Sequence, residues 1–322
     1  MRLVKALPNQ LILKIRIAKV YINAMKKILK KIACMPKRVV KQFSPVDPVR
    51  ARALIFEEKH GYSPNFYEPK TFSEKLNARI LFEDDPYYLL YGTKLFAPYY
   101  AEQKVTEQLS FAKRLKVKEY LDASDFEDLP EQFIMKSSFG SGMNKVVRDK
   151  SSVDPLALCG FFNNSIKTIR NAKGATLASN CVIFEELLLD EKGRVPADFK
   201  FHCFWPDSQR FRYILEIMSG RFADLRQIIL DDEGNVLDFS FVYSFGSLPK
   251  PDGSPELPAN FSDMIDVAKK LSSGFNYIRV DLFNIGGDVY FGEMTPFHGS
   301  GWGRISHKEW DFKLGELWQW EQ

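Results

Sequence analysis

The chain has 322 residues, of which 45% are hydrophobic and 14% aromatic. This composition excludes a disordered or low-complexity protein, because the chain can bury a sizeable core in one large domain or in two to three packed lobes. Its four cysteines are widely spaced and form no Cys-x-x-Cys pair, which argues against a disulfide scaffold or a zinc ribbon. Neither a charge-free apolar run of about 18 residues nor a signal-peptide pattern is present. We therefore expect a soluble protein of the cytoplasm.

The net charge of +4 hides a sharp asymmetry along the chain. Residues 1–41 hold twelve lysines and arginines and no acid, the first acid being Asp47. The rest of the chain then carries 33 basic against 41 acidic residues. The pI of about 8.6 therefore reflects a basic arm on an acidic body and does not predict a nucleic-acid partner. The arm also has a single aromatic residue, Tyr21, whereas RNA binding relies on aromatic rings that stack on bases.

Apolar residues in this arm recur at spacings of four and three. They are Leu11, Ile15, Ala18, Ile22, Met25, Leu29 and Ile32. The spacing predicts an amphipathic helix that stops near Met35-Pro36, because proline disfavours helix in the residue before it. A basic helix of this kind can lie on an anionic membrane surface. It can equally pack on its own protein or pair as a short coiled coil, and the pattern fits both.

Helical patterns follow the arm, with helices expected at residues 50–59, 71–82 and 93–108. The second opens with a capping box, Thr71-Phe-Ser-Glu74. From about residue 133 the pattern changes to short apolar strands separated by Gly and Asn turns. The expected strands are 133–136, 146–147, 182–185, 199–205, 211–218, 227–230, 236–239, 277–283 and 289–293, with one helix at 261–271. Helices followed by antiparallel-looking strands predict α+β lobes rather than a doubly wound sheet.

Two of the segments that connect these predicted elements have recognisable sequence patterns. Residues 231–235, Asp-Asp-Glu-Gly-Asn, predict a hairpin turn between the strands at 227–230 and 236–239. Residues 248–260 contain four prolines and are expected to form a loop or linker.

The first segment that can carry chemistry spans residues 133–147. A strand ends at Lys136, a Gly/Ser loop follows, and a second strand begins near Lys145. Backbone N–H groups of such a loop can approach phosphate oxygens, and a lysine at its base supplies a positive charge. The segment matches neither a Walker A sequence nor Gly-x-Gly-x-x-Gly. A plain hairpin with a glycine turn explains the same pattern and is the commoner feature.

The second segment pairs two acids on adjacent apolar strands. Strict alternation would place Arg279, Asp281 and Phe283 on one face of the first strand, and Phe291, Glu293 and Thr295 on one face of the second. Two facing carboxylates repel unless a cation lies between them. Mg²⁺ bound to substrate phosphates fits, since it commonly uses one or two carboxylates. The alternative is a buried ion pair between Arg279 and one of the acids.

The third segment is an apolar strand that ends in Glu185 and Glu186, followed by Asp198-Phe-Lys200-Phe. It fits a hinge between two lobes, or an ordinary edge strand with solvated acids.

Taken in this order, the segments resemble the TupA-like ATP-grasp family, which is associated with bacterial surface polysaccharide or teichuronopeptide synthesis. The resemblance covers about residues 50–305. Its motifs are Pro69–Asn77, Thr93-Lys94, Phe133–Lys136 with the loop after it, Ile183–Glu186, Asp198–Phe201, Ile278–Phe283 and Phe291–Thr295. The resemblance implies an ATP-grasp fold whose two α+β lobes clasp ATP. Its expected parts are the arm at 1–45, a mostly helical domain at 46–125, a small lobe with the phosphate loop at 126–188, and a C-terminal lobe with the metal site at 189–322.

ATP and Mg²⁺ are the cofactors that the resemblance implies. Two lysines would hold the phosphates, the loop 137–143 would fold over them, and the hinge 185–187 would read adenine. The implied nucleotide-binding residues are Lys94, Lys136, Ser137, Ser138, Gly140, Ser141, Gly142, Glu185, Glu186 and Leu187. Thr93 stands where an Asp commonly precedes the lysine that Lys94 matches, which is a departure from the family pattern.

The implied metal ligands are Asp281, Glu293 and Thr295, the last standing where many relatives carry Asn. Arg279 would stabilise charge on the transferred phosphoryl group. Lys200 would lie near the phosphates or the acceptor carboxylate. The loop 298–303 would border the acceptor site.

The resemblance implies an ATP- and Mg²⁺-dependent carboxylate–amine ligase that works through an acyl phosphate. It would join the carboxylate of a uronic acid in a capsular or other surface glycan to an amino acid or amine. The alternatives are a ligase that acts on a small peptide or metabolite, and a non-catalytic ATP-binding module of a glycan-assembly complex. The expected location is the cytoplasm, free or peripheral on the inner face of the cytoplasmic membrane. His60, His202 and His307 receive no role, because lone histidines on strands or turns are more often structural.

Overall fold

A computed structural model describes residues 47–83, 87–140, 142–173, 181–207, 209–243, 246–251, 253 and 255–320. The predicted arm helix and Ser141 therefore lie outside the described residues. Within these ranges, no helix combines the length and apolar character needed to cross a membrane.

The first described region is helical. It comprises α3 (Pro48–His60), α4 (Phe72–Phe82), α5 (Tyr87–Tyr91) and α6 (Ala97–Lys104). The first two helices lie within two residues of their predicted bounds. The helix predicted at 93–108 corresponds to the shorter α6, and α5 was not predicted; the chain turns between these two helices. Thr93 stabilises this turn: its hydroxyl donates to the Leu90 carbonyl and accepts a bond from the Phe96 amide.

Helix α4 is held by hydrogen bonds at its N-terminus and by a lysine on one of its faces. The predicted capping box forms, with 3.1 Å between the Glu74 amide N and Thr71 Oγ1. The Glu74 carboxylate also accepts bonds from the amides of Asn65, Lys70 and Thr71. Lys75 Nζ reaches the carbonyl oxygens of Gly315 and Trp318, at 2.7 and 2.6 Å. These contacts tie α4 to the C-terminal helix α9 (Lys308–Leu317).

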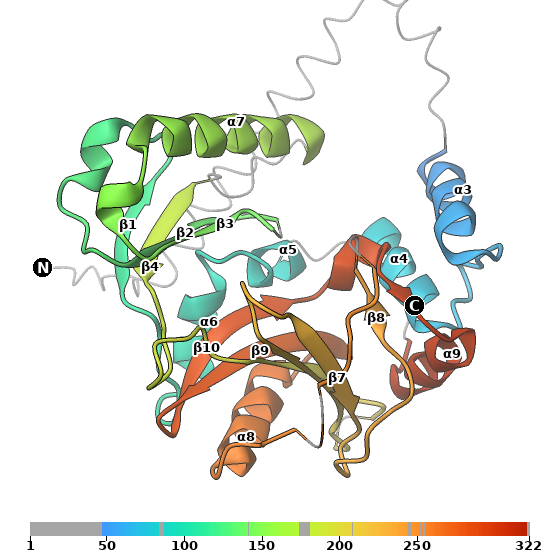
Figure 1. The fold of residues 1–322 in the computed structure, drawn as a ribbon. Helices are drawn as coiled ribbons and strands as arrows, with labels where there is room; N and C mark the ends of the chain where they lie inside the picture. Colours follow the sequence, from blue (N-terminus) through green and yellow to red (C-terminus); the bar gives the residue numbers. More distant parts are fainter. Residues whose placement is uncertain are drawn as a thin grey trace, which may run out of the picture.

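A four-stranded antiparallel sheet follows α6 and forms the small lobe in the upper left of Figure 1. Its order is β1-β4-β2-β3, with β1 (Arg114–Lys118), β2 (Phe133–Ser137), β3 (Asn144–Val147) and β4 (Val182–Glu186). The 3₁₀ turns η1 (Ala123–Phe126) and η2 (Lys150–Ser152) connect its parts, and α7 (Pro155–Lys173) covers one face. The boundary expected at residues 125/126 stays a prediction; β1 pairs with β4 across it.

A five-stranded antiparallel sheet forms the body, in the order β10-β9-β5-β6-β7. The strands are β5 (Asp198–Phe204), β6 (Arg212–Ser219), β7 (Arg226–Leu230), β9 (Tyr277–Ile285) and β10 (Asp288–Thr295). Helix α8 (Phe261–Ser272) packs on one face, as Figure 1 shows. A short pair, β8 (Phe241–Val242) and β11 (Arg304–Ile305), and the 3₁₀ turn η3 (His298–Gly301) complete the described elements.

The strand predicted at 236–239 does not form. The turn before it does: the Asp231 side chain accepts a bond from the Asn235 amide at 2.8 Å. After the turn, however, only one isolated bridge, Leu230 to Val236, continues the pairing. Phe239 is instead buried in a cluster that includes Ile229 of β7 and Trp318.

Alternation along the strands of the large sheet separates two environments. The face under α8 is an apolar core that includes Phe201, Leu215 and Val280. The opposite face carries buried charged and polar side chains from the alternate positions of the same strands. These are Lys200, His202, Glu216, Arg279 and Asp281. The charged face is therefore formed by the same three central strands that form the core.

A β-bulge at Gly292 corrects the predicted faces of β10. Phe291 pairs with Leu282, whereas Glu293 pairs with Asp281, so the register shifts between them. Phe291 consequently lies in the apolar core and Glu293 on the charged face; the prediction that they share a face is wrong. A Cβ at Gly292 would lie 2.8 Å from the Asp281 carbonyl oxygen, so a side chain there would disturb the bulge.

The Glu74 network makes a testable contribution to stability. Glu74→Ala leaves three backbone amides without their carboxylate acceptor, and we expect a loss of roughly 1–3 kcal/mol in the free energy of unfolding. Urea denaturation measures this loss. The matched control is Glu58→Ala, an exposed acid on α3, which should change stability by less than about 0.5 kcal/mol. Equal effects of the two variants would show that the network contributes nothing.

Candidate active site

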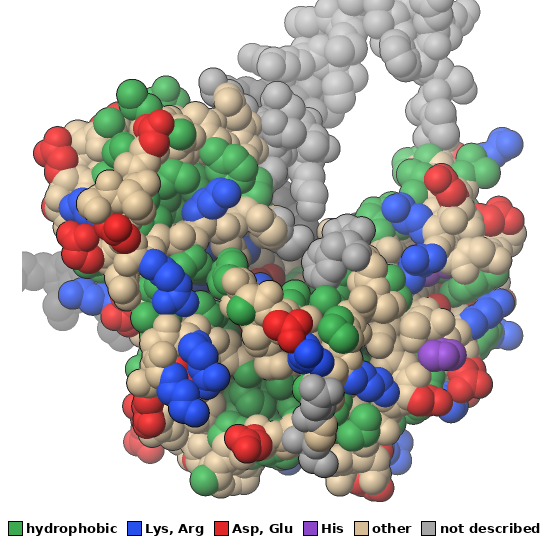
Figure 2. Space-filling view, in the orientation of Figure 1, with side chains coloured by type: hydrophobic (Ala, Val, Ile, Leu, Met, Phe, Trp, Pro, Cys, Tyr) green, Lys and Arg blue, Asp and Glu red, His purple; other side chains and the backbone are tan. Residues whose placement is uncertain are grey.

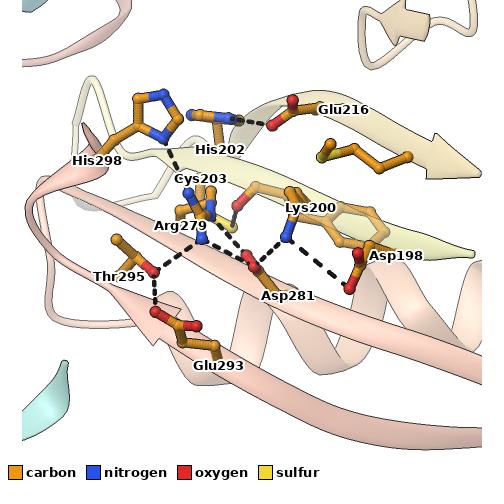
Figure 3. Close-up of polar contacts among 12 residues, drawn as sticks. Asp198, Lys200, His202, Cys203, Glu216, Arg279, Asp281, Glu293, Thr295 and His298 are labelled. Atoms are coloured by element: carbon orange, nitrogen blue, oxygen red, sulfur yellow. Dashed lines mark hydrogen bonds and ion pairs between the residues drawn. The ribbon is translucent and has the colours of Figure 1, made fainter. Parts of the chain in front are cut away.

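Three charged side chains meet on the face of the large sheet opposite α8 (Figure 3). Arg279 binds both carboxylate oxygens of Asp281, with Nε 2.6 Å from Oδ1 and Nη2 2.8 Å from Oδ2. Lys200 Nζ lies 2.5 Å from Asp281 Oδ2. Lys200 and Asp281 are direct neighbours across β5 and β9, which explains the contact. All three residues are at most 8% exposed.

The charges in this cluster stabilise one another. Burial alone would raise the pKa of Asp281, but Arg279 and Lys200 hold it well below its usual range. Burial would likewise lower the pKa of Lys200, but Asp198 and Asp281 raise it above its ordinary value. The cluster is therefore ionised throughout the neutral pH range. Asp198 is itself bound by Arg221, and its Oδ1 lies 3.9 Å from Lys200 Nζ.

The second predicted acid lies beside this cluster. Glu293 pairs with Asp281 across β9 and β10, and Thr295 pairs with Arg279. Thr295 Oγ1 accepts a bond from Arg279 Nη2 and donates one to Glu293 Oε1, both at 3.0 Å. The structure thus brings together every residue predicted as catalytic or metal-binding. It also contains the alternative considered from sequence, a buried ion pair between Arg279 and Asp281.

The donor set of this site fits Mg²⁺ held together with a nucleotide. Among the described residues no group of three or more His, Cys, Asp or Glu side chains could hold a metal ion. Mg²⁺ at nucleotide sites commonly needs only one or two protein carboxylates, the remaining ligands being phosphates and water. Asp281 and Glu293 are such a pair, and within the described part of the chain Glu293 Oε2 receives no hydrogen bond.

A buried polar network lies behind the charged cluster, and the sequence analysis missed it. His202 Nδ1 is 3.1 Å from Tyr277 Oη, and His202 Nε2 is 3.6 Å from Glu216 Oε2. Glu216 Oε1 accepts bonds from Gln227 Nε2 at 2.6 Å and from Tyr243 Oη at 2.7 Å. Burial would raise the pKa of Glu216, but His202 and Lys200 lower it to about 2. The only sequence signal was an acid within an apolar strand.

The lysines predicted to bind phosphate lie on the small sheet or in contact with its loop. Lys136 Nζ lies 2.6 Å from Glu185 Oε2, on the adjacent strand β4. Lys94 Nζ donates to the Gly140 carbonyl at 2.9 Å, and the Lys94 amide donates to the Ser138 carbonyl at 3.1 Å. Lys94 is therefore in contact with the predicted phosphate loop.

Backbone hydrogen bonds also fix the two ends of this loop and the segment 185–187, the predicted hinge. The Ser137 amide donates to the Met143 carbonyl at 3.2 Å, and Gly142 has a φ of 80°, in the region that favours glycine. Glu186 Oε1 accepts a bond from the Lys113 amide at 2.7 Å, so the hinge is attached to the edge strand β1. Leu187 follows directly, half-buried. The alternative of solvated acids is wrong for Glu185, which is buried.

Comparison with known proteins decides the family. The TupA-like ATP-grasp family profile matches residues 74–319. The chain belongs to the TupA-like ATP-grasp family. The resemblance inferred from the motifs is thereby confirmed, and with it the α+β ATP-grasp fold. Among proteins with curated descriptions, none matches this ATP-grasp chain.

Solved structures similar to this family member include ligases at low identity. D-alanine–D-alanine ligase from Helicobacter pylori is 18% identical, with 71% of this chain and 57% of that chain covered and a TM-score of 0.42. An L-amino acid ligase from Bacillus licheniformis is 12% identical, with 71% and 49% covered and a TM-score of 0.44. This chain thus spans about half the length of each of these structures.

The charge of Glu216 gives a prediction with a defined pH dependence. Its lowered pKa means that the carboxylate stabilises the fold above pH 4.5, and that this stability is lost as the pH falls toward about 2. Glu216→Gln retains an acceptor but removes the charge. Urea denaturation at pH 7 should show a loss of roughly 1–3 kcal/mol, which shrinks below pH 4.5. A pH-independent difference, or one no larger than that of the exposed Glu191→Gln control, would contradict the assignment.

Proposed function

We propose that this TupA-like ATP-grasp protein is an ATP- and Mg²⁺-dependent ligase that joins a carboxylate to an amine and releases ADP and phosphate. The observation that carries the proposal is the charged cluster of Arg279, Asp281 and Lys200, with Glu293 aligned beside Asp281. Membership of an ATP-grasp family supports the use of ATP.

Asp281 and Glu293, with Thr295 beside them, would hold Mg²⁺. The cation would neutralise charge on the phosphates. Arg279 and Lys200 already lie on the same side of the sheet, where they would stabilise negative charge on the transferred phosphoryl group. Because both cations are held by Asp281, they need little rearrangement to meet that charge.

The small lobe would hold the rest of the nucleotide. Lys94 and Lys136 would contact its phosphates under the loop 137–143, with backbone N–H groups of this loop directed at phosphate oxygens. The hinge 185–187 would contact adenine. Lys136 is paired with Glu185 at one edge of this site, so nucleotide phosphates would compete with that carboxylate for the ammonium group.

The chemistry needs no nucleophile from the protein. A substrate carboxylate attacks the γ-phosphorus of ATP, and ADP leaves as the acyl phosphate forms. An amine then attacks the acyl carbon, loses a proton, and displaces phosphate to leave an amide. The residues described here would contribute positioning and electrostatic stabilisation, which are the principal sources of catalysis in phosphoryl transfer.

We propose further that the carboxylate belongs to a uronic acid of a bacterial surface glycan and that the amine is an amino acid or a related amine. The association of the family with surface polysaccharide synthesis supports this choice of substrate. The basic arm would hold the enzyme at an anionic membrane, because each basic residue near such a surface contributes about 1 kcal/mol of attraction. On the face of the body shown in Figure 2, basic and acidic side chains are interspersed, whereas the sequence of the arm carries twelve basic residues and no acid.

The reaction class is tested by trapping. With ATP, Mg²⁺, glucuronic acid and hydroxylamine, we expect ADP, phosphate and a hydroxamate, because hydroxylamine intercepts the acyl phosphate. Chromatography separates ADP from AMP, and Asp281→Asn should give none of these products. AMP formation would contradict the mechanism, and a stable phosphate ester on a hydroxyl group would make the enzyme a kinase. Hydroxamate formed from amino acids or peptides but from no uronic acid would keep the ligase and overturn the glycan assignment.

A further inference from the structure

Arg279 has one contact that the proposed mechanism does not use. Its Nη1 lies 2.9 Å from His298 Nδ1, and both residues are at most 8% exposed. A guanidinium group has five N–H donors and no acceptor, so Nδ1 of His298 must accept this hydrogen bond. An imidazole nitrogen that accepts carries no proton, and the ring proton of His298 therefore lies on Nε2.

This contact completes the orientation of the guanidinium group. Nε and Nη2 bind Asp281, and Nη2 also binds Thr295, which leaves Nη1 for His298. Without His298, the buried Nη1 of Arg279 would lose its hydrogen-bond acceptor, and an unpaired buried donor is costly in a protein interior. A guanidinium held on all three nitrogens has a fixed plane and direction.

We propose that His298 is a positioning residue: as the neutral Nε2–H tautomer it holds Arg279 in the orientation in which it meets the transferred phosphoryl group. The catalytic consequence rests on the proposed function, whereas the tautomer rests on the hydrogen bond alone. Arg279 would act on the substrate, and His298 would act through Arg279.

The surroundings of His298 keep it neutral. Its ring centroid lies 4.9 Å from that of His202 and 4.8 Å from that of Phe241. The charged and titratable groups that face it are Arg279, His202, Glu216 and Asp281. Burial, His202 and Arg279 lower the pKa of His298 well below its ordinary value, and they outweigh the two acids.

The backbone of His298 is fixed by a strained turn. Gly299, Ser300 and Gly301 all have positive φ, and a non-glycine residue such as Ser300 rarely adopts this conformation. Helices α3 and α4 hold the turn: Arg52 Nη2 donates to the Ser300 carbonyl at 2.9 Å, and Asn77 Nδ2 donates to the Gly301 carbonyl at 2.8 Å. The helical region is thus linked through this turn to the orientation of Arg279.

The first test uses spectroscopy on the nucleotide-free protein and is independent of the proposed reaction. In ¹⁵N-histidine-labelled protein at pH 7, His298 Nδ1 should resonate as an unprotonated nitrogen and Nε2 as a protonated one. The signals are assigned by their loss in His298→Asn. Arg279→Gln should shift the Nδ1 signal, whereas the matched Arg221→Gln should leave it in place. A proton on Nδ1, or no response to Arg279→Gln, would overturn the proposal.

The second test separates positioning from packing and from substrate contact. His298→Leu keeps an apolar side chain but removes the acceptor, and we expect kcat to fall roughly 10–100-fold with the KM for ATP nearly unchanged. His298→Asn places an amide oxygen near the position of Nδ1 and should recover kcat to within about threefold of wild type. Wild-type kcat in His298→Leu would overturn the positioning role. An equal loss in both variants would instead assign a role to Nε2.

Discussion

Asp281 keeps its charge inside the protein because Arg279 and Lys200 bind both of its oxygens. Burial of ions is expensive, and ion pairs of this kind often give no net stability compared with apolar residues of the same size. Removal of Asp281 would leave two buried cations without the carboxylate that they share, so both depend on it. The cluster is better explained by what it does than by stability: it holds two cations in place on a sheet face, where negative charge can be received without reorganisation.

The rest of the fold can be understood as support for this cluster. The apolar face of the large sheet packs on α8, and the same strands therefore present Lys200 and Arg279 in register with their neighbours. The bulge at Gly292 brings Glu293 opposite Asp281. Behind the cluster, Gln227 and Tyr243 both donate to Glu216 Oε1, and the 298–301 turn, held by α3 and α4, places His298 against Arg279.

The sequence predicted those features that depend on neighbours in the chain. The capping box of α4, the turn at 231–235 and the shared face of Arg279 and Asp281 follow from spacing alone, and all are present. Three of the family motifs, Asp198–Phe201, Ile278–Phe283 and Phe291–Thr295, lie on β5, β9 and β10, the strands that carry the charged cluster and Glu293. The bulge at Gly292 was missed because strict alternation assumes one residue per partner, although an isolated glycine within a strand pattern is a local signal for a bulge.

Features that depend on contacts between distant parts of the chain were also missed. His202, Glu216 and His298 come from β5, β6 and η3, and a single polar residue in an apolar segment does not reveal its partner. Strand β1 alternates basic and apolar residues at the edge of the small sheet, so its pairing with β4 defines it more than its composition does. The strand expected at 236–239 does not continue beyond the bridge at Val236, and Phe239 packs in a cluster with Trp318, which is distant in the sequence.

The central claim is that the cluster around Asp281, with Glu293, forms a site for Mg²⁺ together with a nucleotide. Isothermal titration calorimetry with a non-hydrolysable ATP analogue, in excess Mg²⁺ and in EDTA, tests it most directly. The account predicts that Mg²⁺ strengthens binding to the wild-type protein by roughly tenfold or more, about 1.4 kcal/mol, and that Glu293→Gln largely abolishes this gain. Equal affinity with and without Mg²⁺ in the wild-type protein would contradict the account.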